Sequence, residues 1–297
     1  MKTIVIYHKS DFDGIFCREI ARKFLPQAEL IGWEYGEPTP VVALGDQLYI
    51  LDLSVPDLMS HPKLVWIDHH KTAIDKYSAK IVGYRIDGVA AWLLAWQWFA
   101  PRMRSGDLPS QLPVKQDFID RKVSEPLAVR LAGEYDIWDK RDPDAELFQH
   151  GLRSRELNEN MWNLLLVSEA RSEDQVDIGS VAVEALLEAG EVLQYAKTKE
   201  NASIIKNLGF TRQWEGLTFL CCNAAQYNSF LFVAGLLPEH DACLGFKWVG
   251  TKWSVSLYHA PGKEHHDLSQ IAVKHGGGGH RGACGFTCDT LPFNLKQ

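Results

Sequence analysis

The first 25 residues, MKTIVIYHKSDFDGIFCREIARKFL, contain the pattern that decides the fold. Lys2 to Tyr7 is a short run rich in β-branched residues, and it ends at the polar cluster HKSDFDG. From Ile15 to Leu25 the apolar residues recur at helical spacing. This stretch therefore predicts a strand, a polar loop and a helix, in that order.

The same alternation continues through the amino-terminal half of the chain. Short apolar runs at 30–33, 48–51, 64–67 and 80–82 predict further strands, and 89–99 predicts a helix. Repeated alternation of strands and helices is typical of a mostly parallel sheet covered by helices. Because such sheets bind ligands at the carboxyl ends of their strands, the residues that follow each strand are the first candidates for function.

The remainder of the chain predicts a different organisation. From Val114 to Lys206 the pattern is almost wholly helical, and 181–206, which has no proline and one interior glycine, predicts a connector helix. Further elements are expected as strands at 217–222, 242–249 and 253–258 and as a helix at 268–274. We therefore expect an α/β protein with an amino-terminal parallel-sheet domain at 1–180, a helical linker at 181–208 and a smaller α/β domain at 209–297.

Composition excludes several classes of protein. With 297 residues, 46% hydrophobic and 23% charged, the chain has the usage of an ordinary globular protein. A formal charge of −7 argues against a surface that coats long duplex nucleic acid, whereas a short anionic substrate is compatible with it. The six cysteines form no C-x-x-C pair, and no apolar run approaches the roughly 18 residues of a membrane helix. We expect a cytoplasmic protein with reduced thiols and no membrane partner.

Acids and histidines follow three of the expected strands. They are His8, Asp11, Asp13, Asp52, Asp68, His69 and His70. At one edge of a parallel sheet such carboxylates would repel one another unless cations lay among them. Carboxylate oxygens with a minority of imidazoles suit Mn²⁺, Mg²⁺ or Fe²⁺ better than the thiolate-rich sites that zinc often occupies. Two such ions are suited to in-line attack on phosphorus.

A run of four glycines, Gly276 to Gly279, precedes His280 and Arg281. Consecutive glycines let backbone N–H groups approach a phosphate and form an anion-binding nest. The two basic side chains would add charge-assisted donors. The alternative interpretation is a flexible linker, which we disfavour because linkers are usually rich in serine.

These motifs resemble, in order and spacing, those of the DHH/DHHA1 phosphoesterases. The matching segments are H-x-x-D-x-D-G at 8–14, Asp52, the triplet at 68–70, and GGGH at 277–280 with Ala283 and Gly285. The resemblance covers nearly the whole chain. The compact length and the G-E-Y-D-x-W segment at 133–138 are most similar to the NrnB-type oligoribonucleases.

The resemblance implies a catalytic DHH domain that holds two divalent metal ions, with Mn²⁺ preferred over Mg²⁺. It implies that the metal ligands are His8, Asp11, Asp13, Asp52, His69 and Asp136. Asp52 would bridge the two ions. Asp136 is preferred over Asp139 because it is the first Asp after the tyrosine.

The resemblance also implies catalytic and substrate-binding roles. Asp52, Asp68 and His70 would be catalytic, with Asp68 a metal ligand or a partner of one and His70 beside the substrate phosphate. In the DHHA1 domain, a phosphate away from the scissile bond would be bound by Gly277, Gly278, Gly279, His280 and Arg281. This chain has Tyr258 and His259 where related sequences often have an arginine, so Tyr258 stacking on a base, or Lys263 with Arg281, would replace it.

The expected function is hydrolysis of short single-stranded oligonucleotides (nanoRNA) to mononucleotides. One alternative is a phosphatase or phosphodiesterase for a small nucleotide, such as adenosine 3′,5′-bisphosphate or a cyclic dinucleotide. Another is a catalytically inactive nucleotide-binding protein. An inorganic pyrophosphatase ranks lower because GGGH followed by R-G-A-C-G resembles the oligonucleotide-handling branch. A homodimer is compatible with the sequence.

Overall fold

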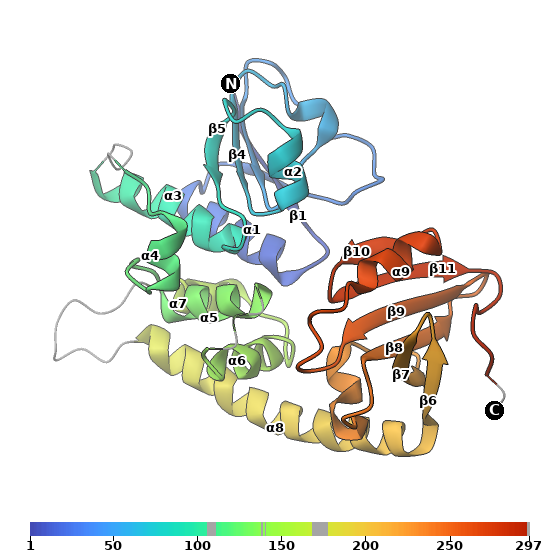
Figure 1. The fold of residues 1–297 in the computed structure, drawn as a ribbon. Helices are drawn as coiled ribbons and strands as arrows, with labels where there is room; N and C mark the ends of the chain where they lie inside the picture. The colour runs from blue at the N-terminus through green and yellow to red at the C-terminus, as the bar shows by residue number, and fades with distance from the viewer. Residues whose placement is uncertain (106–110, 138, 140, 168–177, 296–297) are drawn as a thin grey trace. The chain divides into compact units, whose positions relative to one another are not determined.

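The computed structural model describes residues 1–105, 111–137, 139, 141–167 and 178–295. The chain divides into two compact units, Met1–Leu193 and Gln194–Gln297 (Figure 1). The division falls within the long helix α8 (Ile178–Leu208), which contains the connector predicted from the sequence. The three-part division with a separate linker at 181–208 stays a prediction.

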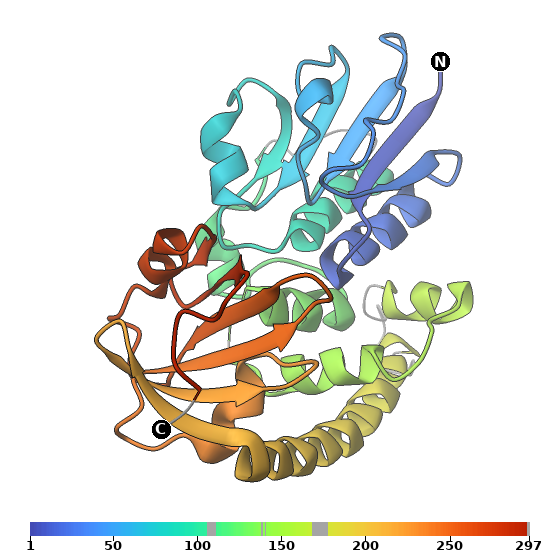
Figure 2. The ribbon, with the colours of Figure 1, turned by 90° about the vertical axis from the view of Figure 1, so that its right-hand side faces the viewer.

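The first unit contains a five-stranded sheet in which every strand pair is parallel (Figure 2). In spatial order the strands are β2 (Glu29–Trp33), β1 (Thr3–His8), β3 (Gln47–Leu51), β4 (Leu64–Asp68) and β5 (Val82–Arg85). The register pairs His8 with Trp33 and Tyr7 with Leu51, so the carboxyl ends of the three strands lie at one edge. The predicted α/β class with a parallel sheet is confirmed.

The fifth strand begins later than the sequence predicts. We expected it at 80–82, but it spans Val82–Arg85. Residues 78–81 form a turn instead, which closes through a 3.2 Å hydrogen bond from the Ile81 amide to the Ser78 carbonyl. The apolar Ile81 was therefore assigned to a strand from the sequence although it lies in a turn.

Alternate residues of β1 supply the two cores of the first unit. Val5 packs against α1 (Phe12–Phe24) and α3 (Ala91–Ser105), where Trp92 and Trp96 are buried as core residues. Ile4 and Ile6 face a second cluster on the other side of the sheet. That cluster includes residues of the 3₁₀ helix η1 (Pro56–Leu58) and of α2 (Lys71–Lys76), a helix that the sequence did not predict.

Between α3 and α8, the described residues form four short helices. They are α4 (Lys115–Ile119), α5 (Leu127–Asp136), α6 (Asp144–Leu152) and α7 (Glu159–Leu165). The helical pattern expected from residue 114 onward is thus confirmed over the residues described there.

The second unit contains a six-stranded mixed sheet of order β10-β11-β9-β8-β7-β6, in which only β7 and β8 pair in parallel. Its elements are β6 (Gly209–Trp214), β7 (Leu217–Asn223), η2 (Ser229–Gly235), β8 (Ala242–Trp248), β9 (Trp253–His259), α9 (Leu268–Lys274), β10 (Gly278–His280) and β11 (Ala283–Cys288). Strands β6, β10 and β11 are additional to the strands expected from the sequence. Because β10 pairs with β11, half of the tetraglycine run is strand rather than open loop or linker.

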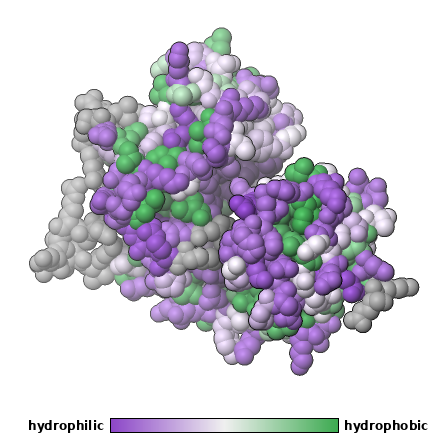
Figure 3. All heavy atoms as spheres, in the orientation of Figure 1, coloured by the Kyte–Doolittle hydropathy of each residue, from purple (hydrophilic) through white to green (hydrophobic). Residues whose placement is uncertain are grey.

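On the face shown in Figure 3, hydrophilic side chains predominate and apolar ones form separate patches. All six cysteines are free, and five of them are buried. Within the described ranges, none of the helices combines the length and the hydropathy that a membrane span requires.

Candidate metal centre

The polar side chains that follow the strands of the first unit gather at one edge of its sheet. His8 ends β1, Asp52 directly follows β3, and His69 directly follows β4. Asp11 caps the amino terminus of α1, where its carboxylate accepts a 3.0 Å hydrogen bond from the Gly14 amide. Two further carboxylates lie at this edge: Asp13 in the first turn of α1 and Asp136 at the end of α5.

Asp52 lies between two histidines. Its Oδ1 is 3.5 Å from Nε2 of His69, and its Oδ2 is 3.6 Å from Nδ1 of His8. The backbone of Asp52 has φ of 64°, a left-handed conformation that costs a residue other than glycine on the order of 1 kcal/mol or more. This conformation turns the chain at the end of β3, so that one carboxylate oxygen faces each imidazole.

The first group of possible ligands lies around His8. Atoms of His8, Asp11 and Asp52 lie within 4.8 Å of one another, and His8 Nδ1 is 2.7 Å from Asp11 Oδ2. Adjacent ligands of one octahedral cation with bonds of 2.0–2.1 Å lie about 3 Å apart. The spacing of these atoms therefore suits a shared cation.

The second group lies around His69. Nε2 of His69 is 3.3 Å from Asp13 Oδ2 and 3.7 Å from Asp136 Oδ2, and the three residues form a second set within 4.8 Å. A third set with the same spacing joins Asp52 and His69 to His70. Asp52 and His69 each belong to two sets, so the sets form one continuous cluster.

The donor atoms fit divalent cations. Asp52 is only 1% exposed, yet neither of its carboxylate oxygens accepts a hydrogen bond, and the buried Oδ2 of Asp136 accepts none either. Within the described residues, no lysine or arginine forms an ion pair with Asp13, Asp52 or Asp136. Because a buried charge is costly unless it is paired or coordinates a metal, this donor set is suited to the hard cations that prefer oxygen with some imidazole.

The carboxylates attract positive charge strongly to the histidines. The contact with Asp11, supported by Asp52, raises the pKa of His8 to about 11. Burial opposes a charged His69, but Asp52 and Asp136 outweigh it and raise the pKa of that imidazole. The carboxylates thus favour a positive charge on both imidazoles.

The carboxylates of the cluster differ in the direction in which the protein shifts their pKa. Burial, with repulsion from Asp52, raises the pKa of Asp13 well above its usual range, and burial raises that of Asp136 to about 6. For Asp52 burial acts in the same direction, but the neighbouring imidazoles outweigh it and lower its pKa. Of Asp13, Asp52 and Asp136, Asp52 is therefore the carboxylate that stays most readily ionised.

The amino terminus of α3 holds Asp13 in place. The amides of Ala91 and Trp92 each donate to one of its oxygens at 3.3 Å. The unpaired amides at a helix amino terminus stabilise a carboxylate. This contact from a distant element was not evident in the sequence.

Asp68 organises the turn that follows β4. It is fully buried, and its Oδ1 accepts hydrogen bonds from the amides of His69 and His70 and from Nδ1 of His70, at 2.7, 3.1 and 2.7 Å. The bond to Asp68 raises the pKa of His70 to about 9. It also leaves Nε2 of this half-exposed imidazole directed away from Asp68.

Asp139, the alternative to Asp136, has another partner. Its Oδ2 is 2.6 Å from a guanidinium nitrogen of Arg141, and among the described residues Asp139 belongs to none of the three sets. Trp138, the last residue of the G-E-Y-D-x-W segment, lies outside the described residues.

The residues predicted to bind a distal phosphate lie in the second unit. Gly277 precedes β10, which contains Gly278, Gly279 and His280, and Arg281 follows in the turn to β11. The guanidinium of Arg281 donates to the His265 carbonyl at 2.8 Å.

The side chains considered as replacements for the arginine of related sequences also have partners within the second unit. Lys263 is paired with Asp241 at 3.1 Å. The half-buried ring of Tyr258 packs against Phe232, with 6.3 Å between ring centroids.

Glu34 is a neighbour of the cluster that the sequence analysis missed. It directly follows β2, and its Oε2 is 3.1 Å from Nε2 of His8. The rule that identified Asp52 and His69, a polar residue after a strand of the parallel sheet, would also have identified Glu34.

Comparisons with known proteins bear on the fold. No family model matches the chain. The uncharacterized protein R106 of Acanthamoeba polyphaga mimivirus is 26% identical over 243 residues, which cover 76% of this chain and 49% of that protein. The chain therefore spans about half the length of this relative.

Among solved structures, the DHH domain of PF0399, described as a member of the s1p family of ribosomal proteins, matches with a TM-score of 0.52. The match has 14% identity and covers 96% of this chain and 82% of that one. The chain has the fold of a DHH domain. The alternating strands and helices that bring the cluster to one sheet edge are thus part of a DHH fold.

Weaker similarity extends to other structures. PggH from Vibrio cholerae, a pGpG-specific phosphodiesterase, matches with a TM-score of 0.46 and 14% identity over 97% of this chain and 93% of that one. RecJ from Thermus thermophilus, solved in complex with Mn²⁺, matches with a TM-score of 0.42 and 13% identity over 97% of this chain and 50% of that one.

Proposed function

We propose that this protein is a metal-dependent phosphodiesterase that uses two divalent ions. The observation that carries the proposal is the position of Asp52, whose two buried oxygens face His8 on one side and His69 on the other. A carboxylate in this position can be shared by two cations. The DHH fold, which places these strand ends side by side, supports the same conclusion.

The ligands divide between the two ions according to the sets described above. His8, Asp11 and Asp52 would hold one ion, and Asp13, His69 and Asp136 would hold the other, with Asp52 shared. The bound ions would supply Lewis-acid activation of the phosphoester and of the attacking water. Mn²⁺ is the ion that we expect, and Mg²⁺ suits the same donors.

His70 is the side chain that we expect to contact the phosphate. Its Nδ1 is bonded to Asp68, so Nε2 can donate to a phosphate oxygen. Its raised pKa keeps the imidazole positively charged near neutral pH, which favours an anionic partner. Asp68 would act through His70 by orienting the ring.

The substrate that we propose is a short single-stranded oligonucleotide, which the enzyme degrades to mononucleotides. The net charge of −7 disfavours a long polyanion, which usually needs a broad basic track. In this proposal residues 1–180 are the catalytic domain and 209–297 the substrate-binding domain. Gly277, Gly278, Gly279, His280 and Arg281 would bind a phosphate away from the scissile bond.

The decisive experiment is a length series of 5′-labelled RNA, from two to about 20 nucleotides, incubated with the full chain and Mn²⁺. We expect cleavage that is fastest for the shortest substrates and is abolished by EDTA. Asp52→Asn and Asp136→Asn should each lower turnover by several orders of magnitude, because both remove a metal ligand. Asp139→Asn is the matched control and should cleave at nearly the wild-type rate.

Two outcomes would contradict the proposal. Wild-type activity in Asp52→Asn would refute the shared carboxylate. Failure of the Mn²⁺-loaded wild type to cleave RNA, bis-p-nitrophenyl phosphate or small cyclic and bisphosphate nucleotides would refute the enzymatic function in favour of a binding protein.

A further inference from the structure

The last residue of β2 and the turn that follows it, Trp33–Glu37, contain no ligand of the proposed metal centre but contact two segments that do. We call this segment the β2 turn. It lies beside the end of β1, because β1 and β2 are paired with His8 opposite Trp33. A hydrogen bond of 3.3 Å from the Lys9 amide to the Trp33 carbonyl continues this pairing past the strand.

Glu34 is the residue of the β2 turn that contacts His8. Its Oε2 lies 3.1 Å from Nε2 of His8 and also accepts a hydrogen bond from the Ser10 hydroxyl. Its Oε1 accepts from the Tyr35 amide at 2.9 Å. Three donors therefore fix this carboxylate in position.

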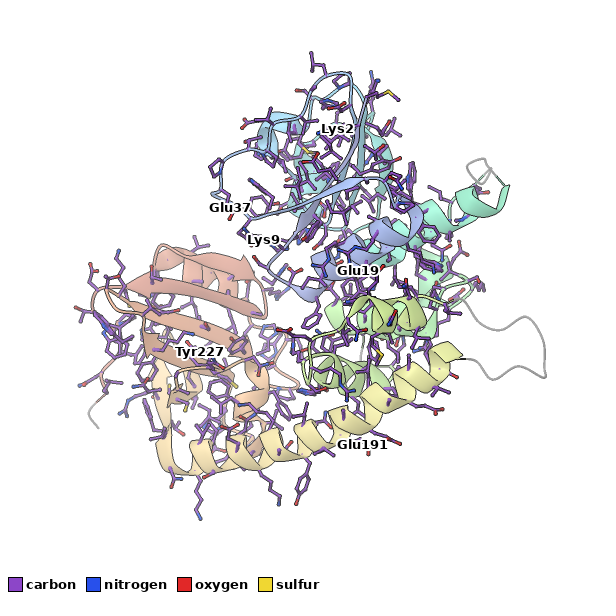
Figure 4. The ribbon with its side chains drawn as sticks, turned by 180° about the vertical axis from the view of Figure 1, so that it is seen from behind. Lys2, Lys9, Glu19, Glu37, Glu191 and Tyr227 are labelled. Atoms are coloured by element: carbon purple, nitrogen blue, oxygen red, sulfur yellow. The ribbon has the colours of Figure 1, made fainter. Side chains whose placement is uncertain are left out.

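The β2 turn is itself held in place at both ends. The Glu34 amide donates to Glu37 at 3.1 Å, and Glu37 is paired with Lys9, the residue after His8; both members of this pair are labelled in Figure 4. On the other side, the Ser54 amide, two residues after Asp52, donates to the Tyr35 hydroxyl at 3.1 Å. The turn thus connects the segment of His8 with the segment of Asp52.

The contact between Glu34 and His8 bears on metal binding because only one nitrogen of a neutral imidazole has a free lone pair. Nδ1 of His8 faces Asp11 and Asp52, at 2.7 and 3.6 Å. If Nε2 keeps its proton in a hydrogen bond to Glu34, the proton that a metal displaces is the one on Nδ1, and the lone pair then lies on Nδ1, the nitrogen that faces the cluster. Carboxylates in this role fix the tautomer and the ring orientation of metal-binding histidines.

We propose that Glu34 is a positioning residue that selects the metal-binding tautomer of His8. This inference rests on the proposed metal centre. It assigns a role to a residue that is not itself a ligand, and it predicts that the ion held by His8 and Asp11 depends on Glu34, whereas the ion held by Asp13, His69 and Asp136 does not.

The test is calorimetric titration of the metal-free full chain with Mn²⁺. Glu34→Ala removes the acceptor and should weaken binding of one ion about 10- to 100-fold while leaving the second ion unchanged. Glu34→Gln keeps a neutral acceptor, so we expect a smaller loss of several-fold. Glu29→Gln, at the opposite and exposed end of β2, makes the same chemical change away from His8 and should bind both ions as the wild type does.

Melting temperatures separate positioning from folding. If Glu34→Ala does not fold, Glu34→Gln decides, and wild-type affinity in a folded Glu34→Gln would overturn the inference. Equal weakening of both ions would also overturn it. A wild-type chain that binds no Mn²⁺ would refute the metal centre itself, which is a distinguishable result.

A second and independent observation concerns Arg153, the residue that follows α6. Its guanidinium carbon lies 5.4 Å from the centre of the Phe12 ring and 5.7 Å from that of Tyr135. Phe12 lies between Asp11 and Asp13 in the sequence, and Tyr135 precedes Asp136. The two rings therefore hold the cation beside both ligand-bearing segments.

Within the described parts of the chain, Arg153 has no partner of opposite charge. Among the residues with described placement, no carboxylate forms an ion pair with it, although the side chain is exposed and the chain is acidic overall. The rings restrict the guanidinium without using its N–H donors. From this geometry we infer that Arg153 binds a phosphate oxygen of the substrate, which deepens the proposed function by adding a contact within the first unit.

The test compares Arg153→Ala with Arg153→Lys, using Arg155→Ala as the matched control. Loss of a hydrogen bond to a charged group costs about 1.5–3 kcal/mol, so Arg153→Ala should raise KM for a diribonucleotide about 10- to 100-fold. Arg153→Lys should restore part of this loss. Arg155, whose Nε donates to the neighbouring Ser154 hydroxyl, contacts neither ring, and its alanine variant should have the wild-type KM.

A purely structural role would give a different result. If Arg153→Ala lowers the melting temperature or Mn²⁺ affinity but leaves KM unchanged, the inference is wrong. If the wild type cleaves no dinucleotide, the proposed function fails, and binding of the uncleaved dinucleotide to the wild type and Arg153→Ala still decides whether the contact exists.

Discussion

Asp13 is a buried carboxylate whose neighbours include other carboxylates. It is 4% exposed, and burial together with repulsion from Asp52 and Asp136 raises its pKa well above its usual range. An ionised Asp13 therefore destabilises the metal-free protein, and a metal would offset this cost. Function and stability are opposed at this residue.

Asp13→Asn tests this opposition. Asparagine cannot ionise, but its single oxygen can accept from only one of the two amides, that of Ala91 or that of Trp92, which offsets part of the gain. We expect the metal-free variant to melt a few degrees above the metal-free wild type, which corresponds to about 1 kcal/mol. Differential scanning calorimetry with and without Mn²⁺ measures this, and Mn²⁺ should stabilise the wild type far more than the variant. A variant that melts below the metal-free wild type would show that Asp13 does not destabilise the fold.

Glu125 should make the stability of the fold depend on pH, independently of the metal centre. Burial raises the pKa of this carboxyl to about 7, against an opposing hydrogen bond from Gln97. Because the pKa is higher in the folded than in the unfolded chain, the folded state binds more protons, and this contribution to stability is lost as the pH rises from about 4.5 to 7.

Glu125→Gln should remove that loss. We expect the free energy of unfolding of the variant to exceed that of the wild type by up to about 3 kcal/mol at pH 8, and to match it near pH 4. Urea titrations at the two pH values measure the difference. A constant difference at both pH values would mean that packing, not ionisation, separates the two proteins.

At the scale of elements, the junction of β1 and α1 sets the positions of the proposed ligands His8, Asp11 and Asp13. A Cβ at Gly14 would lie 1.7 Å from the carbonyl oxygen of His8, so the start of the helix can approach the end of the strand only without a side chain there. The Asp11 cap on the Gly14 amide depends on the same approach.

Gly14→Ala should therefore separate the two elements and displace Asp11 and Asp13. We expect a loss of stability of about 1–3 kcal/mol and weaker Mn²⁺ binding by the variant that still folds. Gly45→Ala is the control, because a Cβ at Gly45 meets no atom within 4 Å. Melting curves and Mn²⁺ titrations of both variants measure the effect, and normal Mn²⁺ affinity in Gly14→Ala would disprove the role of this junction.

The sequence predicts elements best where their apolar pattern is regular. The strand ends at His8, Asp52 and Asp68 could be found because parallel strands present their last residues at one edge of the sheet. The start of β5 could not, because Ile81 is apolar yet lies in a turn. Strand β10 was missed because glycines have no side-chain pattern. The hydrogen bonds from the start of α3 to Asp13 could not be predicted either, because they join residues 78 or more positions apart in the sequence.

At the scale of the whole molecule, the two units have separate cores. Two apolar clusters flank the parallel sheet of the first unit, and two others flank the mixed sheet of the second. All of the residues that form the three possible metal sets lie between His8 and Asp136, within the first unit. Among the described residues, the second unit contributes none of these sets.

Mn²⁺ should therefore stabilise one unit selectively. A ligand at about 100 times its dissociation constant stabilises the state that binds it by about 2.7 kcal/mol. Hydrogen exchange read by mass spectrometry should show slower exchange with Mn²⁺ in peptides from β1, β3, β4 and α1. Peptides from β7, β8 and β9 should exchange at unchanged rates, because the backbone hydrogen bonds of these strands lie in the sheet of the second unit. Equal protection of both units would show that α8 couples them into one cooperative system, whereas protection of the second unit alone would place the metal there and refute the assignment of Asp52.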